Sequence, residues 1–330
     1  MKIVIEDKVP FLDGVFEPYA EVSRIPSSAI TAGSLRDADA LIARTRPRLD
    51  ASTLDGTGVK VIATATIGTD HIDLDSCRSH GIKVYNAPGC NAPAVAQWVL
   101  ASILSLPGLA DGATIGIVGA GNVGTIVARW AASIGFRVLL NDPPREKLEG
   151  PSGFVPQERI AREADIITFH TLLTRDTEFP TYHLADSRFF NSLHRKPVIV
   201  NAARGEVVET SSLVAALHDG KVSHALIDCW EGEPAIDREL LSLADVATPH
   251  IAGYSIEGKR RASAAAAKAV AGVFGLADVA MPWSPPLPPG VMTRPRILQS
   301  YNPAGDTSSL KSQPEKFEYL RNNYNLRREP

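Results

Sequence analysis

The sequence predicts an α/β protein with two doubly wound parallel-sheet domains and a short C-terminal extension. Two observations predict this fold class. Short apolar runs alternate with helical patterns along the 330 residues, and this order is typical of parallel sheets covered by helices. A long apolar helix, predicted at 92–106, divides the runs into two series. The chain length suits about two domains.

The first series of strands lies in the N-terminal part of the chain. Its predicted strands are four short apolar runs: KIVIED (2–7), ADALIAR (38–44), VKVIATAT (59–66) and IKVYNAPG (82–89). A helical pattern, LDSCRSHG (74–81), precedes the last run. Gly81 can end this helix, because glycine accepts the left-handed backbone found at helix C-termini.

The second series predicts another parallel sheet within residues 92–250. Its five strand candidates are ATIGIVGAG (113–121), FRVLLND (136–142), ADIITFH (164–170), KPVIVNAARG (196–205) and VSHALIDCW (222–230). An Ala-rich stretch, 257–275, then predicts a helix. The Pro-rich stretch 282–295 is expected to run extended over a surface, and the tail 311–330 is polar.

Composition and charge argue against several classes of partner. A formal net charge of −3 gives no reason to expect nucleic acid or an anionic membrane. No apolar run approaches the roughly 20 residues that span a bilayer, and the N-terminus carries no secretory signal. Cys77, Cys90 and Cys229 have neither metal-site nor redox spacing. We therefore expect a cytoplasmic protein with reduced thiols and no metal site.

A dinucleotide-binding motif opens the second series. GAGNVG (119–124) matches G-x-G-x-x-G, with a strand candidate before it and a helical pattern after it. Glycines at these positions permit a tight turn and let the backbone approach a pyrophosphate at the helix N-terminus. The predicted cofactor-binding residues of the motif are Gly119, Gly121, Asn122, Val123 and Gly124. The alternative is a glycine-rich turn that binds no nucleotide.

Asp142 indicates which dinucleotide binds. It ends the next strand, about 20 residues after the first glycine, where an acid can bind the ribose hydroxyls of NAD. The same carboxylate disfavours the extra phosphate of NADP. Arg145 lies close by and leaves NADP open as an alternative, but the predicted cofactor is NAD.

Three further residues follow predicted strands and suit one reaction. Arg204 follows VIVNAA, Glu233 lies in DCWEGEP, and His250 ends the last apolar run. Ligands of open parallel sheets bind beyond the carboxyl ends of the strands, so all three can face one crevice. Taken singly, Arg204 and Glu233 are also consistent with a surface ion pair, and His250 with a structural histidine.

The three residue types match the oxidation of a 2-hydroxy acid. That reaction passes a hydride to nicotinamide and removes a proton from the hydroxyl, and a histidine titrating near neutral pH is suited to accept the proton. A carboxylate beside the ring orients it and stabilises the imidazolium. An arginine can bind the substrate carboxylate through two parallel hydrogen bonds.

Four motifs in this order, GAGNVG, NAARGEVV, DCWEGEP and TPHIAG, resemble the D-isomer-specific 2-hydroxyacid dehydrogenases up to about residue 280. The resemblance implies an Arg204, Glu233 and His250 catalytic set, and places Asp228 and Thr171 at the cofactor. It also implies a Rossmann-type NAD-binding domain inserted into a flavodoxin-like substrate domain. The implied boundaries are 1–91 with 251–280 for the substrate domain, 92–250 for the NAD domain, and 281–330 for a reduced dimerisation segment of a homodimer.

Narrower motifs resemble one branch of this family. They are TATIGTDHID (64–73), APGCNAPAV (87–95) and HIAGYSIEGK (250–259). The substrate that this resemblance implies is a small phosphorylated 2-hydroxy acid, 4-phospho-D-erythronate, oxidised at C2 on the route to pyridoxal phosphate. It implies substrate contacts for Thr45, Thr66 and Tyr254, and places Gly253 at the cofactor.

The substrate phosphate requires a cationic partner. Arg44 and Arg46 flank Thr45 and are the candidates, with solvated loop positions as the alternative. His71 is expected to make a structural hydrogen bond rather than to bind substrate. The basic stretch 259–261 is expected to form a solvated helix face, with phosphate attraction as the alternative.

The sequence departs from the family pattern at two places within the domains. Gln97 stands where the family usually has glutamate, and FHTLL (169–173) lacks the usual proline. The alternatives for function are another 2-hydroxyacid dehydrogenase, of the phosphoglycerate or glyoxylate/hydroxypyruvate type, and a non-catalytic NAD-sensing protein like the corepressors that share this fold.

Overall fold

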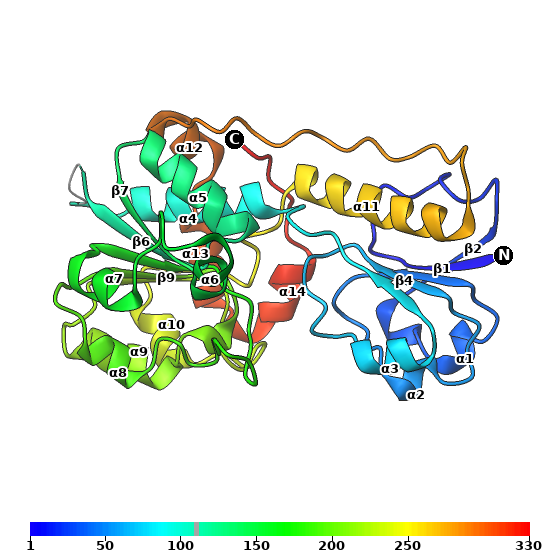
Figure 1. The fold of residues 1–330 in the computed structure, drawn as a ribbon, viewed down its shortest axis with the longest axis horizontal. Coiled ribbons are helices and arrows are strands. Elements are labelled where there is room, and N and C mark those ends of the chain that lie inside the picture. Colours follow the sequence, from blue (N-terminus) through cyan, green and yellow to red (C-terminus); the bar gives the residue numbers. More distant parts are fainter. Residues whose placement is uncertain (109–111) are drawn as a thin grey trace. The chain divides into compact units, whose positions relative to one another are not determined.

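Two parallel β-sheets organise the chain (Figure 1), and they confirm the predicted fold class. The computed structural model describes residues 1–108 and 112–330. Unit 1 comprises Met1–Asn91 and Ser255–Leu287, and unit 2 comprises Ala92–Tyr254 and Pro288–Pro330. Within the described residues, no helix combines the length and the apolar character needed to cross a membrane.

Unit 1 contains a five-stranded parallel sheet in the order β2-β1-β3-β4-β5, which is the strand order of flavodoxin-like folds. Its strands are β1 (Lys2–Glu6), β2 (Glu21–Ile25), β3 (Ala40–Ala43), β4 (Val61–Thr64) and β5 (Lys83–Tyr85). The edge strand β2 is missing from the sequence prediction, because EVSRI is only partly buried and has no continuous apolar run.

Helices cover both faces of this sheet (Figure 1). The short helices η1 (Ser27–Ala29), α1 (Ala32–Leu35), α2 (Ala51–Leu54) and α3 (Leu74–Ser79) belong to unit 1, and α1 to α3 lie on one face. On the other face lies α11 (Ile256–Phe274), which begins with a Ser255 side-chain cap and ends at Gly275 in the left-handed conformation. Its alanines face the sheet and let the helix pack closely on β4.

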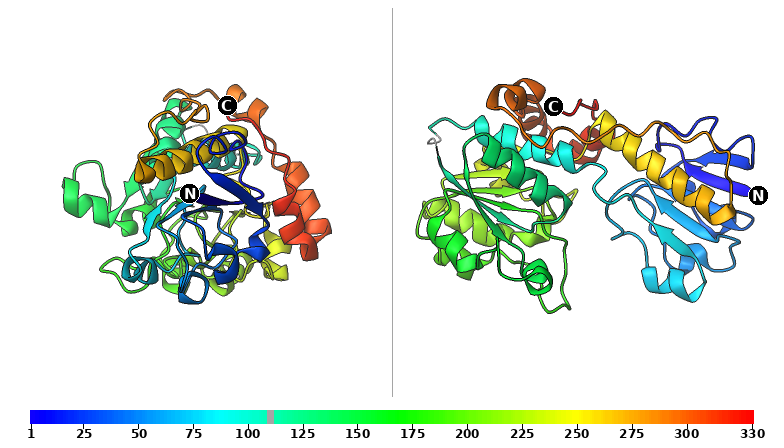
Figure 2. Two further views of the ribbon diagram at one scale, coloured as in Figure 1. Left: turned by 90° about the vertical axis from the view of Figure 1, so that its right-hand side faces the viewer. Right: turned by 45° about the horizontal axis from the view of Figure 1, so that its top comes forward.

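The basic stretch of α11 is not a solvated helix face. Arg261 is buried, and its Nε donates to the Cys90 carbonyl at 2.7 Å. The Arg260 guanidinium lies 4.2 Å from the centre of the Phe11 ring. Arg261 also donates to the Pro286 carbonyl, which holds the extended segment 276–287 alongside the helix (Figure 2).

Unit 2 contains a six-stranded parallel sheet in the order β11-β10-β9-β8-β6-β7. Its strands are β6 (Thr114–Val118), β7 (Arg137–Asn141), β8 (Ile166–Phe169), β9 (Val198–Asn201), β10 (His224–Ile227) and β11 (Val246–Ala247). The strand order reverses between β6 and β8, which creates a switch point where such sheets bind ligands.

The helices of unit 2 form two layers around its sheet (Figures 1 and 2). One core holds α4 (Ala92–Leu104) and α5 (Asn122–Ser133), and α12 (Arg294–Ser300) packs on α4. The other core lies on the opposite face of the same sheet. The remaining helices of the unit are α6 (Pro143–Glu149), α7 (Gln157–Glu163), α8 (Ser187–Asn191), η2 (Gly205–Val207), α9 (Thr210–His218), α10 (Arg238–Leu243), α13 (Ala304–Ser312), η3 (Pro314–Lys316) and α14 (Phe317–Asn322).

Residues 288–330 are integrated into unit 2 through Gln97. The buried Gln97 amide donates to the carbonyls of Ser300 (3.2 Å) and Arg328 (2.8 Å), and its oxygen accepts from Arg327 Nε at 2.8 Å. A glutamate carboxylate could not make the two donations. The departure from the family at this position therefore suits the way this chain holds its C-terminal segment.

Arg327 also ties the C-terminal segment to the rest of unit 2. Its guanidinium donates to the carbonyls of Ala94 (3.0 Å), Ile251 (2.9 Å), Ala252 and Tyr254 (3.2 Å). The C-terminal segment thereby holds the backbone of residues 251–254.

We expect Arg327→Met to destabilise unit 2 by about 2–4 kcal/mol, because several partly buried carbonyls lose a charged donor while the apolar stem is kept. Thermal denaturation followed by circular dichroism measures the change. Arg296→Met, at an exposed position on α12, is the matched control. Equal melting temperatures for the two variants would contradict this account of the C-terminal segment.

Candidate active site

The loop after β6 has the geometry of a dinucleotide-binding turn. Gly119 has φ +92°, and a Cβ there would lie 2.7 Å from the His170 carbonyl carbon. A Cβ on Gly124 would overlap the Gly119 carbonyl oxygen. At Gly121, no described atom lies within 4 Å of the position a Cβ would take. The fold thus requires the first and third glycines, whereas the second leaves open the side that a ligand would approach.

Polar groups without partners surround this loop. Gly121 is the N-cap of α5 and provides no side-chain hydrogen bond, and the first N–H groups of a helix have no partner within the helix. His170 Nδ1 and Thr171 Oγ1, directly after β8, are buried and have no hydrogen-bond partner in the described part of the chain. Buried polar atoms rarely lack partners, so the loop fits a polar cofactor such as NAD.

Asp142 and Arg145 favour NAD over NADP. The Asp142 carboxylate accepts from the backbone N–H groups of Ala120 (2.8 Å) and Arg145 (3.0 Å), and so ties α6 to the glycine loop. The Arg145 guanidinium makes two hydrogen bonds of 2.7 Å to Glu149. Arg145 is therefore already paired with a carboxylate, and this weakens it as a partner for the phosphate of NADP.

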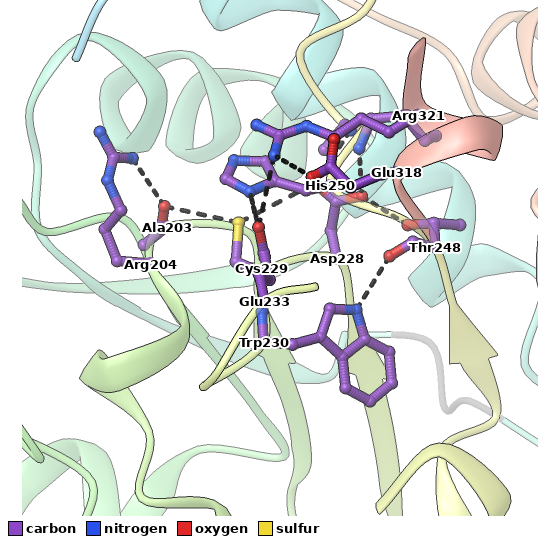
Figure 3. A network of polar contacts seen from close by, with 12 residues as sticks. Ala203, Arg204, Asp228, Cys229, Trp230, Glu233, Thr248, His250, Glu318 and Arg321 are labelled. Carbon is purple, nitrogen blue, oxygen red and sulfur yellow. Dashed lines mark hydrogen bonds and ion pairs between the residues drawn. The ribbon is translucent and has the colours of Figure 1, made fainter. Parts of the chain in front are cut away.

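The three predicted catalytic residues follow β9, β10 and β11, at the carboxyl edge of the sheet (Figure 3). His250 Nδ1 lies 2.9 Å from Glu233 Oε2 and 3.1 Å from Oε1. Glu233 Oε1 also accepts from the Trp230 N–H at 2.9 Å. Arg204 follows β9, and its Nη1 donates to the Ala203 carbonyl at 2.8 Å. The structure therefore shows the His250–Glu233 pair that the sequence predicts.

The surroundings keep Glu233 ionised. Burial alone would raise the pKa of its carboxyl, but the charge of His250 and the hydrogen bonds from His250 and Trp230 outweigh burial. The pKa of Glu233 consequently lies below its ordinary value, and the carboxylate can orient and stabilise an imidazolium.

His250 has an unusual backbone conformation. Its φ of +55° is uncommon for a residue with a side chain, and such conformations persist only where the surroundings fix them. Its N–H lies 2.9 Å from the Asp228 carbonyl and 3.0 Å from that of Thr248.

Asp228 holds the turn that follows His250. Its carboxylate is almost fully buried and accepts from Thr248 Oγ1 (2.5 Å) and from the N–H groups of Ile251 (2.8 Å) and Ala252 (2.9 Å). Burial raises the pKa of Asp228, against the effect of the His250 charge and these bonds. Gly253 belongs to the same turn. The nicotinamide contact of Asp228 and the cofactor contact of Gly253 stay predictions.

Cys229 completes the polar cluster beside the pair (Figure 3). Its Sγ, a Glu233 oxygen and a His250 ring nitrogen lie within 4.8 Å of one another, a spacing that three metal ligands can also have. Burial and the charges of Asp228 and Glu233 raise the pKa of the Cys229 thiol well above its usual range. The Cys229 thiol is neutral, and the His250 imidazole is hydrogen-bonded to the Glu233 carboxylate. The cluster therefore suits proton transfer better than metal binding.

Most of the predicted substrate residues lie at the carboxyl ends of β3 and β4 in unit 1. Thr45 is exposed, Arg46 is half-buried beside it, and the Thr66 hydroxyl lies 2.5 Å from that of Thr64. Arg44 contacts Glu6, which is fully buried: its Nη2 lies 2.5 Å from Oε1, and its backbone N–H donates to Oε2 at 2.6 Å. This pairing occupies the Arg44 side chain and weakens Arg44 as a phosphate ligand.

His71 lacks the structural hydrogen bond expected of it. Both ring nitrogens are buried without a hydrogen-bond partner among residues 1–108 and 112–330. Burial lowers the pKa of His71, although the charges of Asp70 and Glu6 oppose this, and the ring is neutral at physiological pH.

The sequence reasoning missed Arg321 and Arg327. Arg321 Nη1 lies 3.5 Å from Glu233 Oε2, and Arg327 holds the turn after His250. The only signal in the sequence is the polar tail 311–330, to which the sequence analysis assigns no role.

Comparison with known proteins agrees with this geometry. Residues 97–252 match the family model described as D-isomer specific 2-hydroxyacid dehydrogenase, NAD binding domain. The chain is 48% identical over 339 residues to an erythronate-4-phosphate dehydrogenase of Bacteroides thetaiotaomicron, covering 100% of this chain and 97% of that protein.

Two solved structures share the fold. The D-lactate dehydrogenase of Aquifex aeolicus, in complex with NAD and lactic acid, has a TM-score of 0.70 and 26% identity, covering 83% of this chain and 96% of that one. The NAD-bound 3-phosphoglycerate dehydrogenase of Entamoeba histolytica has a TM-score of 0.71 and 25% identity, covering 87% and 99%.

We expect Gly121→Ala to weaken NADH binding by about tenfold or more without loss of stability, because the added methyl group meets no protein atom but occupies the side that the pyrophosphate approaches. NADH fluorescence titration measures the affinity. Gly272→Ala on α11, where a Cβ also meets no described atom, is the matched control. An unchanged affinity in Gly121→Ala would contradict this placement of the cofactor.

Proposed function

The chain belongs to the D-isomer specific 2-hydroxyacid dehydrogenases, and on this basis we propose that it oxidises 4-phospho-D-erythronate at C2 to 2-oxo-3-hydroxy-4-phosphobutanoate, with NAD as the hydride acceptor. The observation that carries the proposal is the His250–Glu233 pair at the carboxyl edge of the NAD-binding sheet. The full-length likeness to erythronate-4-phosphate dehydrogenases supports this substrate and a role on the route to pyridoxal phosphate.

His250 is the proton acceptor in this proposal. Because its Nδ1 is held by Glu233, Nε2 is the ring nitrogen that takes the hydroxyl proton from the substrate. The ionised Glu233 stabilises the imidazolium that results. Bound NAD supplies the site that accepts the hydride from C2.

Arg204 binds the substrate carboxylate. Arg204 lies shortly after the end of β9 and caps η2, and its guanidinium carries paired N–H groups that match a carboxylate. Its positive charge also polarises the carbonyl that forms at C2 and balances the developing negative charge on its oxygen.

Unit 2 is the cofactor domain in this proposal, and unit 1 is the substrate domain. Thr45, Thr66 and Arg46 then provide hydroxyl and cationic groups for the phosphorylated acid, and Tyr254 contributes from unit 2. We assign the protein to the cytoplasm, which agrees with its three buried free thiols. A homodimer is supported by exposed apolar side chains in the Pro-rich stretch 282–295, of which Trp283 is 64% and Val291 72% accessible.

Steady-state assays with NAD test the substrate. The four acids to compare are 4-phospho-D-erythronate, D-glycerate, D-lactate and 3-phosphoglycerate. We expect kcat/KM to be highest with 4-phospho-D-erythronate, because the relatives aligned over the whole chain are named for this substrate. A higher kcat/KM with an unphosphorylated acid would refute the proposed substrate. Binding of NADH with no turnover of any 2-oxo acid would instead indicate a cofactor-sensing protein.

We expect His250→Ala to lower kcat by about 10²- to 10⁴-fold while the affinity for NADH stays nearly unchanged, because only the proton acceptor is removed. Stopped-flow measurement of NADH formation and fluorescence titration give the two quantities. His194→Ala, at an exposed position in the same unit, is the control and should retain wild-type activity. Activity of His250→Ala close to that of the control would rule out the proton-transfer role.

A further inference from the structure

A residue far along the chain reaches the catalytic pair. Arg321 lies on α14, and its side chain is only 14% exposed. Its Nη1 lies 3.5 Å from Glu233 Oε2, the same oxygen that lies 2.9 Å from His250 Nδ1 (Figure 3). Glu233 is therefore shared between a histidine that gains a proton during the reaction and an arginine whose charge is permanent.

Arg321 also hydrogen-bonds the side chain of Tyr254. This tyrosine follows His250 by four residues and is the substrate contact that the sequence predicts in unit 2. Its ring packs edge-to-face on Tyr324, with the ring centres 6.1 Å apart. One guanidinium thus joins the acid of the catalytic pair to the residue assigned to the substrate.

The fold holds Arg321 in place from both sides. Phe317, one helical turn earlier, is buried in the core of unit 2, and Glu318 lies 3.9 Å from Arg321 Nη1. Arg327, further along, holds the backbone of residues 251–254. The position of Arg321 is therefore supported by the packing of Phe317 before it and by the hydrogen bonds of Arg327 after it.

We propose that Arg321 is a positioning residue of the active site, which orients the Glu233 carboxylate toward His250 and the Tyr254 hydroxyl toward the substrate, and whose charge keeps His250 available as a base. The effect of Arg321 on turnover rests on the proposed function. Its effect on the protonation of His250 can be measured in the protein without substrate.

The charges around His250 give the direction of the effect. The groups that surround His250 are the Glu233 carboxylate, whose pKa is lowered, the Asp228 carboxyl, whose pKa burial raises, the cations Arg204 and Arg321, and the neutral thiol of Cys229. Removal of Arg321 leaves the Glu233 carboxylate, which contacts the His250 ring, less compensated, and so favours a proton on His250.

Titration of the His250 ring tests the charge effect without any turnover. The protein is labelled with ¹³C at histidine Cε1, the His250 signal is assigned with His250→Ala, and its pKa is measured in four proteins. Arg321→Gln should move the His250 titration to higher pH than in wild type. Arg321→Lys, which keeps the charge, and Arg296→Gln, an equal loss of charge at an exposed position on α12, should not. Coincident titrations of Arg321→Gln and Arg296→Gln would overturn the proposal.

Kinetics test the orienting role separately. Arg321→Lys keeps a cation but loses the fork that contacts both Glu233 and Tyr254, so kcat/KM should fall about tenfold with NADH affinity unchanged. Wild-type kcat/KM in this variant would overturn the orienting role. If Arg321→Gln does not fold, Arg321→Lys is the test that remains. The proposal then requires that this variant show the same His250 titration as wild type together with a lower kcat/KM. Absence of activity in the wild-type enzyme would refute the proposed substrate and leave the titration result standing.

Discussion

The buried carboxylate of Asp228 determines the geometry on which the candidate active site depends. A buried anion is costly unless hydrogen bonds satisfy it, and three donors from residues 248–252 converge on this one. Their convergence forces the chain to turn sharply directly after β11. His250 lies within this turn, with a left-handed backbone, and its ring consequently lies beside Glu233. A group that need not take part in the chemistry thus places the groups that do.

The same requirement for paired charges recurs in both units. Glu6 is fully buried and is neutralised by Arg44, whereas Glu233 lies between His250 and Arg321. Breaking a buried pair is strongly destabilising because it leaves one charge without a partner. These pairs therefore limit which charged residues of the two units are available to bind a substrate.

Local patterns in the sequence predict most strands and the glycine loop, because that information lies within a few residues. The His250–Glu233 pair is what the family resemblance implies, and the structure places the two side chains in contact. The edge strand β2 was missed because its residues are only half-buried. The sequence makes Arg44 a phosphate candidate because it does not reveal the pairing with Glu6, which lies 38 residues away. Arg321 was missed for the same reason: only the packing of α14 brings it to Glu233.

The contact between Arg327 and the active-site turn has a consequence for synthesis on the ribosome. The carbonyl of Tyr254 emerges 73 residues before the arginine that holds it. Between them, residues 255–287 complete unit 1. The nascent chain therefore cannot finish unit 2 before it has supplied the last helix of unit 1, although domains commonly fold in the order of their synthesis. The hydrogen bonds from Arg327 to the carbonyls of residues 251–254 can therefore form only after the last helix of unit 1 has been made.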